Sequence, residues 1–414
     1  MNSTTSVKRW ARRCTAISAV IIGLVIITGH IFLKKPEGLL APVPTQDLGG
    51  LVVPNQQLVE LVAVSDSPSK ASPVIYGFLP YWNISHFTLN RVVTHLAYFS
   101  FELDAKGNFI ATSPGYSNFG GEAYQEFAAQ AVAAGKKNEL VVAMFDADNT
   151  AAFLNCKTCR ENFYEQVLEL IKTKNLSGIN IDFEYLGTVT PQLRKNYTLF
   201  LQGLRGSLQR SGMREVKISI DIFGDGANMY NLWDMKEISQ IVDYVIVMGY
   251  DYKTRRSDVP GPVAPTLGKD SWGNDILGGL KKLLEQVPPE KVILAVPFYG
   301  YEWRVTGRSL DEAKTYPGTG ATLTYKRLQE LLGRRRELRL EERWDESSLT
   351  PYITYEEDEE IFMAFFENAR SMNYKVDLAR GLNLAGVAIW ALGYEGESSS
   401  LWPAIESFTK GQLN

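Results

Sequence analysis

The chain has 414 residues, of which 45% are hydrophobic and 22% are charged, and its net charge at pH 7 is −4. This composition is that of a folded protein and excludes a disordered chain, a collagen-like chain and a polytopic membrane protein. Nucleic-acid binding needs an excess of positive charge, whereas this chain is slightly acidic, so we expect no nucleic-acid partner. Three cysteines and three histidines are too few for a disulfide scaffold and argue against a four-ligand zinc site, so no metal or other cofactor is expected.

The N-terminal residues form a predicted membrane anchor. Residues 14–33 are an uncharged, mostly apolar run, and a helix of about 20 residues spans a hydrocarbon core of about 30 Å. Four Lys or Arg residues precede the run and two follow it. We therefore expect a single-pass membrane protein with a cytoplasmic tail at 1–13 and the rest of the chain outside the cytoplasm. A cleaved signal peptide is the alternative, although its apolar region is normally shorter.

Residues 34–73 form a predicted linker outside the membrane. Residues 36–73 contain six prolines and no Phe, Trp or Tyr, and such a composition cannot build a core of its own. The folded domain is therefore expected over residues 74–414.

Eight apolar, strand-like runs follow from residue 74, and amphipathic stretches separate most of them. Because the runs are apolar on both faces, they fit strands of a parallel sheet that helices cover. Eight such strands over about 340 residues favour a (β/α)8 TIM barrel, with an open doubly wound sheet as the alternative. The stretch from about 304 to 380 is too long for one helix and its loops, so we expect an inserted α+β subdomain between strands 7 and 8. The runs span residues 74–82, 94–103, 140–145, 178–185, 216–223, 243–251, 292–303 and 385–393.

In such a barrel the active site lies at the C-terminal ends of the strands. Those ends carry carboxylates and large aromatic side chains in this sequence. Aromatic faces stack on sugar rings, while carboxylates and amides bind sugar hydroxyl groups, so we predict a carbohydrate site. Candidate stacking residues are Trp82, Trp303 and Trp390, for which a place in the core at the barrel rim is the alternative. Asp221, at the end of the fifth run, is a further candidate lining residue.

The fourth run concentrates the acidic residues. Side chains alternate along a strand with a period of two, so Asn180, Asp182 and Glu184 share one face and apolar residues share the other. The apolar face must meet the helices, which directs the amide and the two acids into the barrel. Two acids one pleat apart suit catalysis in which the inner acid stays ionised and the outer acid is a protonated general acid. A buried polar network that only fixes the strand register is the alternative.

The fourth run reads S-G-I-N-I-D-F-E over residues 177–184 and resembles the signature DGxDxDxE of glycoside hydrolase family 18, the chitinase-like barrels. Other marks of the family follow in order. They are an aromatic pair at the end of the first strand, the sequence M-G-Y-D over residues 248–251 and a Trp in the last strand. The resemblance covers about residues 74–405 and is greatest to the branch of bacterial spore-cortex and peptidoglycan N-acetylglucosaminidases.

The resemblance implies a retaining, substrate-assisted hydrolysis of β-1,4-linked N-acetylglucosamine glycans, such as peptidoglycan or chitin. Glu184 would protonate the glycosidic oxygen, Asp182 would orient the acetamide group of the substrate, and Tyr250 would hydrogen-bond the acetamide oxygen. The partner is then a polysaccharide, and a carbohydrate-binding scaffold without turnover is the alternative. The expected substrate-binding residues are Tyr81, Trp82, Asn180, Met248, Asp251, Trp303 and Trp390. Asp251 either acts at the strand end or anchors a loop.

Two positions depart from the family signature, because Ser177 and Asn180 stand where the signature has Asp. With one carboxylate fewer in the strand, we expect like-charge repulsion to raise the pKa of Glu184 less than in an all-acid strand. The Asn180→Asp variant should then move the alkaline limb of the pH–rate profile upward.

Cys156 and Cys159 form a C-K-T-C motif in a predicted loop before a helix. We expect a local disulfide or a pair of thiols that stiffens this loop. A redox function is the alternative, but the thioredoxin-like βαβ context that such a function needs is missing.

Overall fold

The structure is a computed structural model that describes residues 72–86, 88–228, 231–396 and 400–410. The predicted cytoplasmic tail, the predicted anchor at 14–33 and almost all of the predicted linker lie outside the described residues. Within the part of the chain that is described, no helix combines the length and the apolar character needed to cross a membrane.

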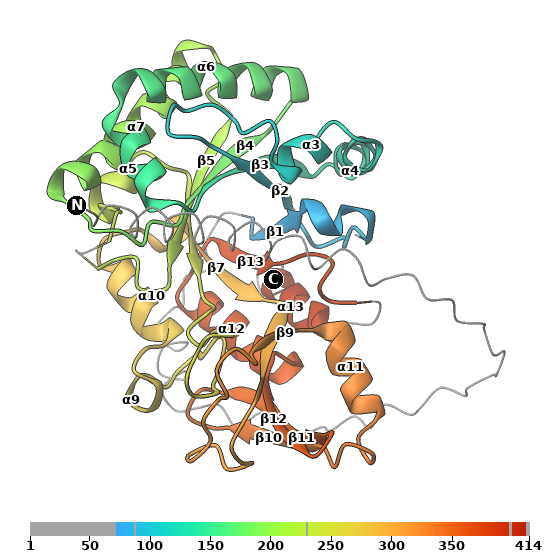
Figure 1. The fold of residues 1–414 in the computed structure, drawn as a ribbon. Helices are drawn as coiled ribbons and strands as arrows, with labels where there is room; N and C mark the ends of the chain where they lie inside the picture. The colour runs from blue at the N-terminus through green and yellow to red at the C-terminus, as the bar shows by residue number, and fades with distance from the viewer. Residues whose placement is uncertain (1–71, 87, 229–230, 397–399, 411–414) are drawn as a thin grey trace, which may run out of the picture. The chain divides into compact units, whose positions relative to one another are not determined.

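Eight parallel strands close into a barrel in the order β1-β13-β7-β6-β5-β4-β3-β2 (Figure 1). The first strand pairs with both β2 and β13, which closes the barrel. The predicted (β/α)8 TIM barrel is thereby confirmed. The barrel strands are β1 (Val74–Pro80), β2 (His95–Glu102), β3 (Lys137–Met144), β4 (Gly178–Phe183), β5 (Lys217–Phe223), β6 (Tyr244–Met248), β7 (Val292–Pro297) and β13 (Gly386–Trp390).

Several helices pack on the outer face of the barrel, where their apolar residues share one buried core with outward-facing strand residues. The helix at residues 325–333 instead buries Leu328 and Leu331 in a separate core. The longest, α7, begins with a Thr190 cap whose hydroxyl accepts from the backbone of Leu193, and with Pro191 in its first turn. The helices are α3 (Pro114–Asn118), α4 (Glu122–Ala133), α5 (Ala147–Asn155), α6 (Lys157–Lys174), α7 (Pro191–Arg210), α8 (Met235–Ile238), α9 (Lys269–Trp272), α10 (Ile276–Leu284), α11 (Tyr325–Gly333), α12 (Ala369–Gly381) and α13 (Trp402–Lys410), with 3-10 turns η2 (Tyr81–His86) and η3 (Pro289–Lys291).

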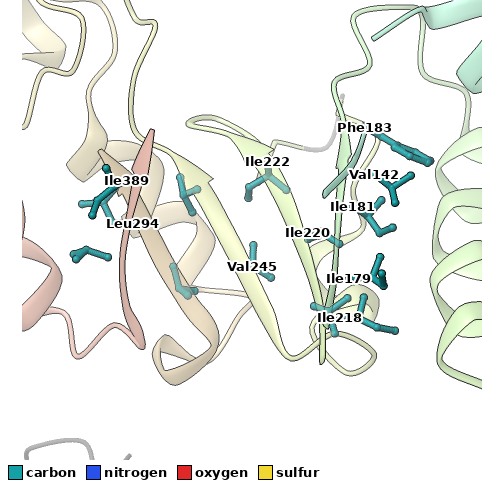
Figure 2. Close-up of a cluster of buried hydrophobic side chains, with 14 of the residues drawn as sticks. Val142, Ile179, Ile181, Phe183, Ile218, Ile220, Ile222, Val245, Leu294 and Ile389 are labelled. Atoms are coloured by element: carbon teal, nitrogen blue, oxygen red, sulfur yellow. The ribbon is translucent and has the colours of Figure 1, made fainter. Parts of the chain in front are cut away.

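The two faces of β4 differ in polarity as the sequence pattern predicts. Ile179, Ile181 and Phe183 are fully buried on the side that faces the helices (Figure 2). Phe183 stacks on Phe200 of α7 with ring centroids 5.5 Å apart. Burial of each of these side chains stabilises the fold by about 2 kcal/mol. A register slip of one residue would move the apolar side chains inside the barrel and the acids toward the helices, and the loss of this burial energy opposes such a slip.

A second, antiparallel sheet in the order β10-β11-β12-β8-β9 interrupts the barrel between β7 and β13. Its strands are β8 (Tyr299–Arg304), β9 (Ala321–Thr324), β10 (Glu341–Asp345), β11 (Thr350–Glu357) and β12 (Glu360–Phe365). The expected inserted subdomain is therefore present, but its sheet extends from 299 to 365 rather than from about 304 to 380. The helix α12, which lies within the expected range, contacts β7 and β13 and belongs to the barrel.

The apolar run 292–303 is two strands rather than one. It forms β7 of the barrel up to Pro297 and then β8 of the inserted sheet from Tyr299. Both strands are largely buried, so a continuous apolar pattern gives no sign of the residue at which the chain changes sheets.

A buried ion pair joins the end of the inserted sheet to the barrel. Lys375 Nζ on α12 lies 2.8 Å from Glu367 Oε2, and the two side chains are 0% and 2% exposed. The Ser371 hydroxyl donates to the same carboxylate oxygen at 2.6 Å.

We expect the Lys375→Met variant to lower the free energy of unfolding by about 3–5 kcal/mol, because it leaves the Glu367 carboxylate buried without its partner. Urea denaturation of both proteins measures the difference. The double variant Glu367→Gln/Lys375→Met serves as the control and should recover most of the loss. A loss below about 1 kcal/mol in the single variant, the size typical of an exposed pair, would contradict an ionised buried pair.

Candidate active site

The end of β4 carries the amide and the two acids. Asn180 and Asp182 are buried inside the barrel, at 0% and 3% exposure, and Glu184 is half-buried just beyond the strand end. The backbone N–H of Glu184 still donates to the carbonyl oxygen of Met144 on β3 at 3.0 Å. Pairing of β4 therefore continues to Glu184 and holds its backbone in place.

The surroundings of Glu184 favour its protonated form. Burial is the main cause and the negative charge of Asp251 adds to it, and together they raise the pKa of Glu184 to about 6. Burial, followed by the charges of Asp221 and Glu184, also raises the pKa of Asp182. A carboxyl group that titrates near pH 6 retains a proton to donate under mildly acidic conditions, as a general acid must.

Tyr250 follows β6 at the same end of the barrel. Burial, followed by the charges of Asp221, Asp182 and Glu184, raises the pKa of its hydroxyl group. The hydroxyl therefore remains a hydrogen-bond donor at any ordinary pH and lies within electrostatic reach of both candidate catalytic acids.

Asp251 connects the barrel with the inserted sheet. Its Oδ1 accepts hydrogen bonds from the hydroxyl groups of Tyr299 at 2.5 Å and Tyr301 at 3.0 Å, both on β8. Its backbone adopts a left-handed conformation with φ of 61°, which is uncommon for a residue other than glycine and recurs at functional sites. These hydrogen bonds agree with the alternative in which Asp251 anchors the loop after β6, and a role at the strand end stays a prediction.

We expect the Asp251→Asn variant to lose activity at a lower pH than the wild type. Without the negative charge the pKa of Glu184 falls, so Glu184 loses its proton earlier, and the alkaline limb of the kcat/KM profile moves down by roughly 0.5–1 pH unit. Tyr301→Phe removes a hydrogen bond without removing a charge and should move the limb less. Coincident alkaline limbs in wild type and Asp251→Asn would contradict the effect of this charge.

Aromatic rings meet at this end of the barrel around Phe99 of β2. Its ring centroid lies 4.6 Å from that of Trp390, 6.1 Å from that of Trp82 and 6.4 Å from that of Phe145. Trp82 and Phe145 are 45% and 48% exposed, and exposed rings of this size are typical of ligand-binding surfaces. Phe145 is not among the residues expected from the sequence, although its place as the last residue of the apolar run 140–145, directly after β3, was a usable signal.

The other expected sugar-binding residues lie at strand ends as well. Tyr81 immediately follows β1 and packs edge-to-face on Trp82 at 4.8 Å. Met248 is the last residue of β6 and is 9% exposed, and Trp390 is the last residue of β13 and is half-buried. These positions are compatible with contact to one bound glycan.

Comparison with known proteins agrees with this arrangement. Residues 68–395 match the sequence profile described as Glycosyl hydrolases family 18, and this match covers well over half of the chain. The chain belongs to glycosyl hydrolase family 18. The resemblance carried by the fourth strand is thereby confirmed, and the chain is a glycoside hydrolase by family.

Relatives of this family 18 hydrolase include bacterial glycosylases. The uncharacterized glycosylase YvbX of Bacillus subtilis is 28% identical over 272 residues, which are 64% of this chain and 71% of YvbX. The cortical fragment-lytic enzyme of Bacillus subtilis is 23% identical over 314 residues, which are 73% of this chain and 65% of that enzyme. The crystal structure of the Group IV chitinase of Ostrinia furnacalis has a TM-score of 0.69 at 19% identity and covers 82% of this chain and all of the chitinase chain. This last likeness shows the fold alone.

Trp303 is not part of the hydrolase's sugar-binding surface, and that expectation is wrong. Its side chain is fully buried in the core of the inserted sheet, and its indole N–H donates to the carbonyl oxygen of Thr254 at 3.2 Å. The error follows from the run 292–303, because a single strand of that length would have placed Trp303 at the end of the barrel.

The family 18 site contains a further acid on a neighbouring strand, although Asn180 replaces an Asp of the signature. Asn180 Nδ2 donates to Asp221 Oδ1 on β5 at 2.8 Å and to Ser219 Oγ at 3.1 Å. Asp221 is buried at 4% exposure. The adjacent strand thus brings a carboxyl group to the amide, and the weaker like-charge repulsion expected at Glu184 stays untested by this contact. The effect of Asn180→Asp stays a prediction.

The hydrolase contains the expected disulfide between Cys156 and Cys159. Cys156 is the cap residue of α6, and the backbone N–H of Cys159 in the first turn points to the Cys156 sulfur at 3.2 Å. The disulfide therefore holds the start of this helix, in agreement with a stiffening role for the loop.

Proposed function

We propose that this family 18 hydrolase is a retaining glycosidase that cleaves β-1,4-linked N-acetylglucosamine glycans by substrate-assisted catalysis. The observation that carries the proposal is Glu184, a half-buried carboxyl group with a pKa of about 6 on the same strand face as Asp182. Relatives named cortical fragment-lytic enzyme and chitinase support peptidoglycan first and chitin second as the substrate.

In the proposed mechanism Glu184 gives its proton to the glycosidic oxygen as the bond to the anomeric carbon breaks. The carbonyl oxygen of the sugar's own acetamide group attacks that carbon from the opposite face and forms an oxazolinium ion. Water then opens the ion while Glu184 takes up a proton from the water, and two inversions leave the configuration retained. A nucleophile that is attached to the reacting sugar has a high effective concentration, so the protein need not supply one.

Asp182 and Tyr250 act on the acetamide group in this scheme. The carboxylate of Asp182 accepts the acetamide N–H and stabilises the positive charge of the oxazolinium ion. The hydroxyl of Tyr250 donates to the acetamide oxygen and keeps it in line with the anomeric carbon. Trp390 offers an apolar face beneath the sugar, and the exposed rings of Trp82 and Phe145 offer stacking surfaces for neighbouring sugars.

We further propose that residues 14–33 anchor the hydrolase with its barrel outside the cytoplasm, where a cell-wall glycan is accessible. The excess of positive charge before the run supports this orientation. Protease added to intact cells should then digest the barrel domain. A barrel domain that becomes sensitive only after lysis would contradict the orientation.

The activity is tested with the full-length protein and its Glu184→Gln variant. Both are incubated with purified peptidoglycan and with N-acetylglucosamine oligomers, and new reducing ends are identified by mass spectrometry. Reducing ends at N-acetylglucosamine that depend on Glu184 are expected, and the preferred polymer defines the substrate. Equal results from both proteins, with glycan retained by each, would replace the proposal with a carbohydrate-binding scaffold.

A further inference from the structure

The interior of the barrel holds more acid than the proposed mechanism uses. Asp182 lies on β4, Glu184 directly follows that strand, and Asp221 lies on β5. Glu139 of β3 lies deeper in the barrel at 1% exposure. Among the described residues, no Lys or Arg forms an ion pair with Asp182, Glu184 or Asp221. Carboxylates that share a buried site without a cation cannot all ionise at neutral pH.

The strand register places Asp221 beside Asp182. Ile181 of β4 pairs with Ile220 of β5, so the next residues, Asp182 and Asp221, occupy adjacent positions on neighbouring strands. Such strands lie about 4.8 Å apart, and side chains at adjacent positions point to the same face. The electrostatic effect of Asp221 on Asp182 is consistent with this closeness.

One oxygen of the buried Asp182 carboxylate has no hydrogen-bond donor among the described residues. Its Oδ1 is buried and accepts no hydrogen bond from any described N–H or hydroxyl group, and a buried acceptor without a donor is costly. Asp221 has a defined acceptor oxygen, because Asn180 Nδ2 donates to its Oδ1 at 2.8 Å. Its second oxygen, Oδ2, is the atom left to carry a proton.

We propose that Asp221 is a protonated carboxylic acid that positions Asp182 by donating a hydrogen bond from its Oδ2 to the Asp182 carboxylate. Asn180 orients Asp221 for this contact. The proposal rests on the proposed function, because it keeps Asp182 in the ionised form that the acetamide group requires. It also explains how the site tolerates Asn180 where the family signature has Asp. The acid that partners Asp182 is then Asp221 on β5 rather than a residue of β4.

Within the described part of the chain, the surroundings of Asp221 supply no positive charge that would keep it ionised. Burial raises its pKa well above the usual range, and the charges of Glu184 and Glu139 raise it further, while the hydrogen bond from Asn180 lowers it. Apart from Asp182, the remaining groups that face it are hydroxyl groups, and that of Tyr76 donates to Glu139 Oε2 at 2.7 Å. The polar and titratable neighbours are Tyr76, Glu139, Asn180, Asp182, Glu184, Tyr197, Ser219 and Tyr250.

The test compares the acid limb of the kcat profile, where Asp182 must ionise, in the wild type and three variants. Asp221→Ala removes the donor, so ionised Asp182 is less stable and the limb should move up by about one pH unit. Asp221→Asn keeps an N–H donor and should leave the limb within about 0.3 unit of the wild type. Ser219→Ala removes the other Asn180 contact, at 3.1 Å, and controls for a purely structural network.

The direction in which the acid limb moves distinguishes a protonated Asp221 from an ionised one. If Asp221 were ionised, both Asp221 variants would relieve repulsion and move the acid limb down, which would overturn the proposal. An unmoved limb in Asp221→Ala together with lower thermal stability would overturn it too, because a structural role predicts that result. If Asp221→Ala does not fold, the pH profile of Asp221→Asn still distinguishes a protonated Asp221, for which the acid limb stays in place, from an ionised Asp221, for which the limb moves down.

A second measurement does not depend on turnover. The infrared band of protonated carboxyl groups at pH 7 should be smaller by one carboxyl in Asp221→Asn than in Ser219→Ala, and equal bands would overturn the proposal. A wild type that hydrolyses neither polymer would refute the proposed function alone, because the infrared comparison would still report the proton on Asp221.

Discussion

The Glu184→Gln variant is expected to lower kcat on natural glycans by a factor of about 10²–10⁴, the usual contribution of a general acid. Glutamine is nearly the same size and can still accept a hydrogen bond, but it has no proton to give to the glycosidic oxygen. The loss should therefore appear in kcat, while the affinity for N-acetylglucosamine oligomers stays within a few-fold of that of the wild type.

Two comparisons make this result specific. An aryl glycoside, whose leaving group departs without protonation, should lose much less activity in Glu184→Gln than the natural glycan does. The wild-type profile of kcat/KM should fall with an apparent pKa of about 6 as Glu184 ionises, and the residual activity of the variant should lack that limb. A reduction of less than about tenfold on the natural glycan would remove Glu184 from the role of general acid.

The Asp182→Asn variant is expected to lower kcat by a factor of about 10²–10³, as the loss of one electrostatic contact to a charged transition state typically does. The amide oxygen can still accept the acetamide N–H, so ground-state binding and KM should change little. What the variant loses is the negative charge that stabilises the oxazolinium ion in the proposed mechanism. Steady-state kinetics on the same oligomers separates the two effects.

Asp146→Asn provides a matched control for Asp182→Asn. Asp146 also follows a barrel strand, but its carboxylate caps α5 by accepting from the backbone N–H of Asn149 at 2.8 Å, and asparagine caps a helix about as well as aspartate. Its kcat should stay near the wild-type value. An Asp182→Asn loss that appears in KM rather than in kcat would assign Asp182 to substrate binding.

The sequence predicts those parts of the site that depend on one strand at a time. The period of two along β4 places Asn180, Asp182 and Glu184 on one face, and the eight runs predict the closed barrel. The contact between Asn180 and Asp221 was not predicted, because it depends on how β4 and β5 pair. That register pairs Asn180 with Ser219 and is set by the packing of the whole barrel rather than by either strand alone.

The misplacement of Trp303 has a similar cause, because the sequence does not specify which strands pair with one another. Its run is mostly apolar, and apolar residues indicate that a strand is buried but not which sheet or helix buries it. The chain leaves the barrel after Pro297, and the strand that follows is buried against β12 and β9 instead. A prediction made from burial alone therefore locates the strand correctly and assigns it to the wrong sheet.

The hydrogen bonds from Tyr299 and Tyr301 to Asp251 have a consequence for how enzymes on this barrel diverge. The two donors belong to the inserted sheet, whereas the carboxyl group whose proton affinity Asp251 alters belongs to the barrel. Substitutions in the insertion that alter Tyr299 or Tyr301 can therefore shift the pH range of activity while the proposed catalytic residues stay the same. Adaptation to surroundings of different pH could therefore occur through a segment that carries none of the proposed catalytic groups.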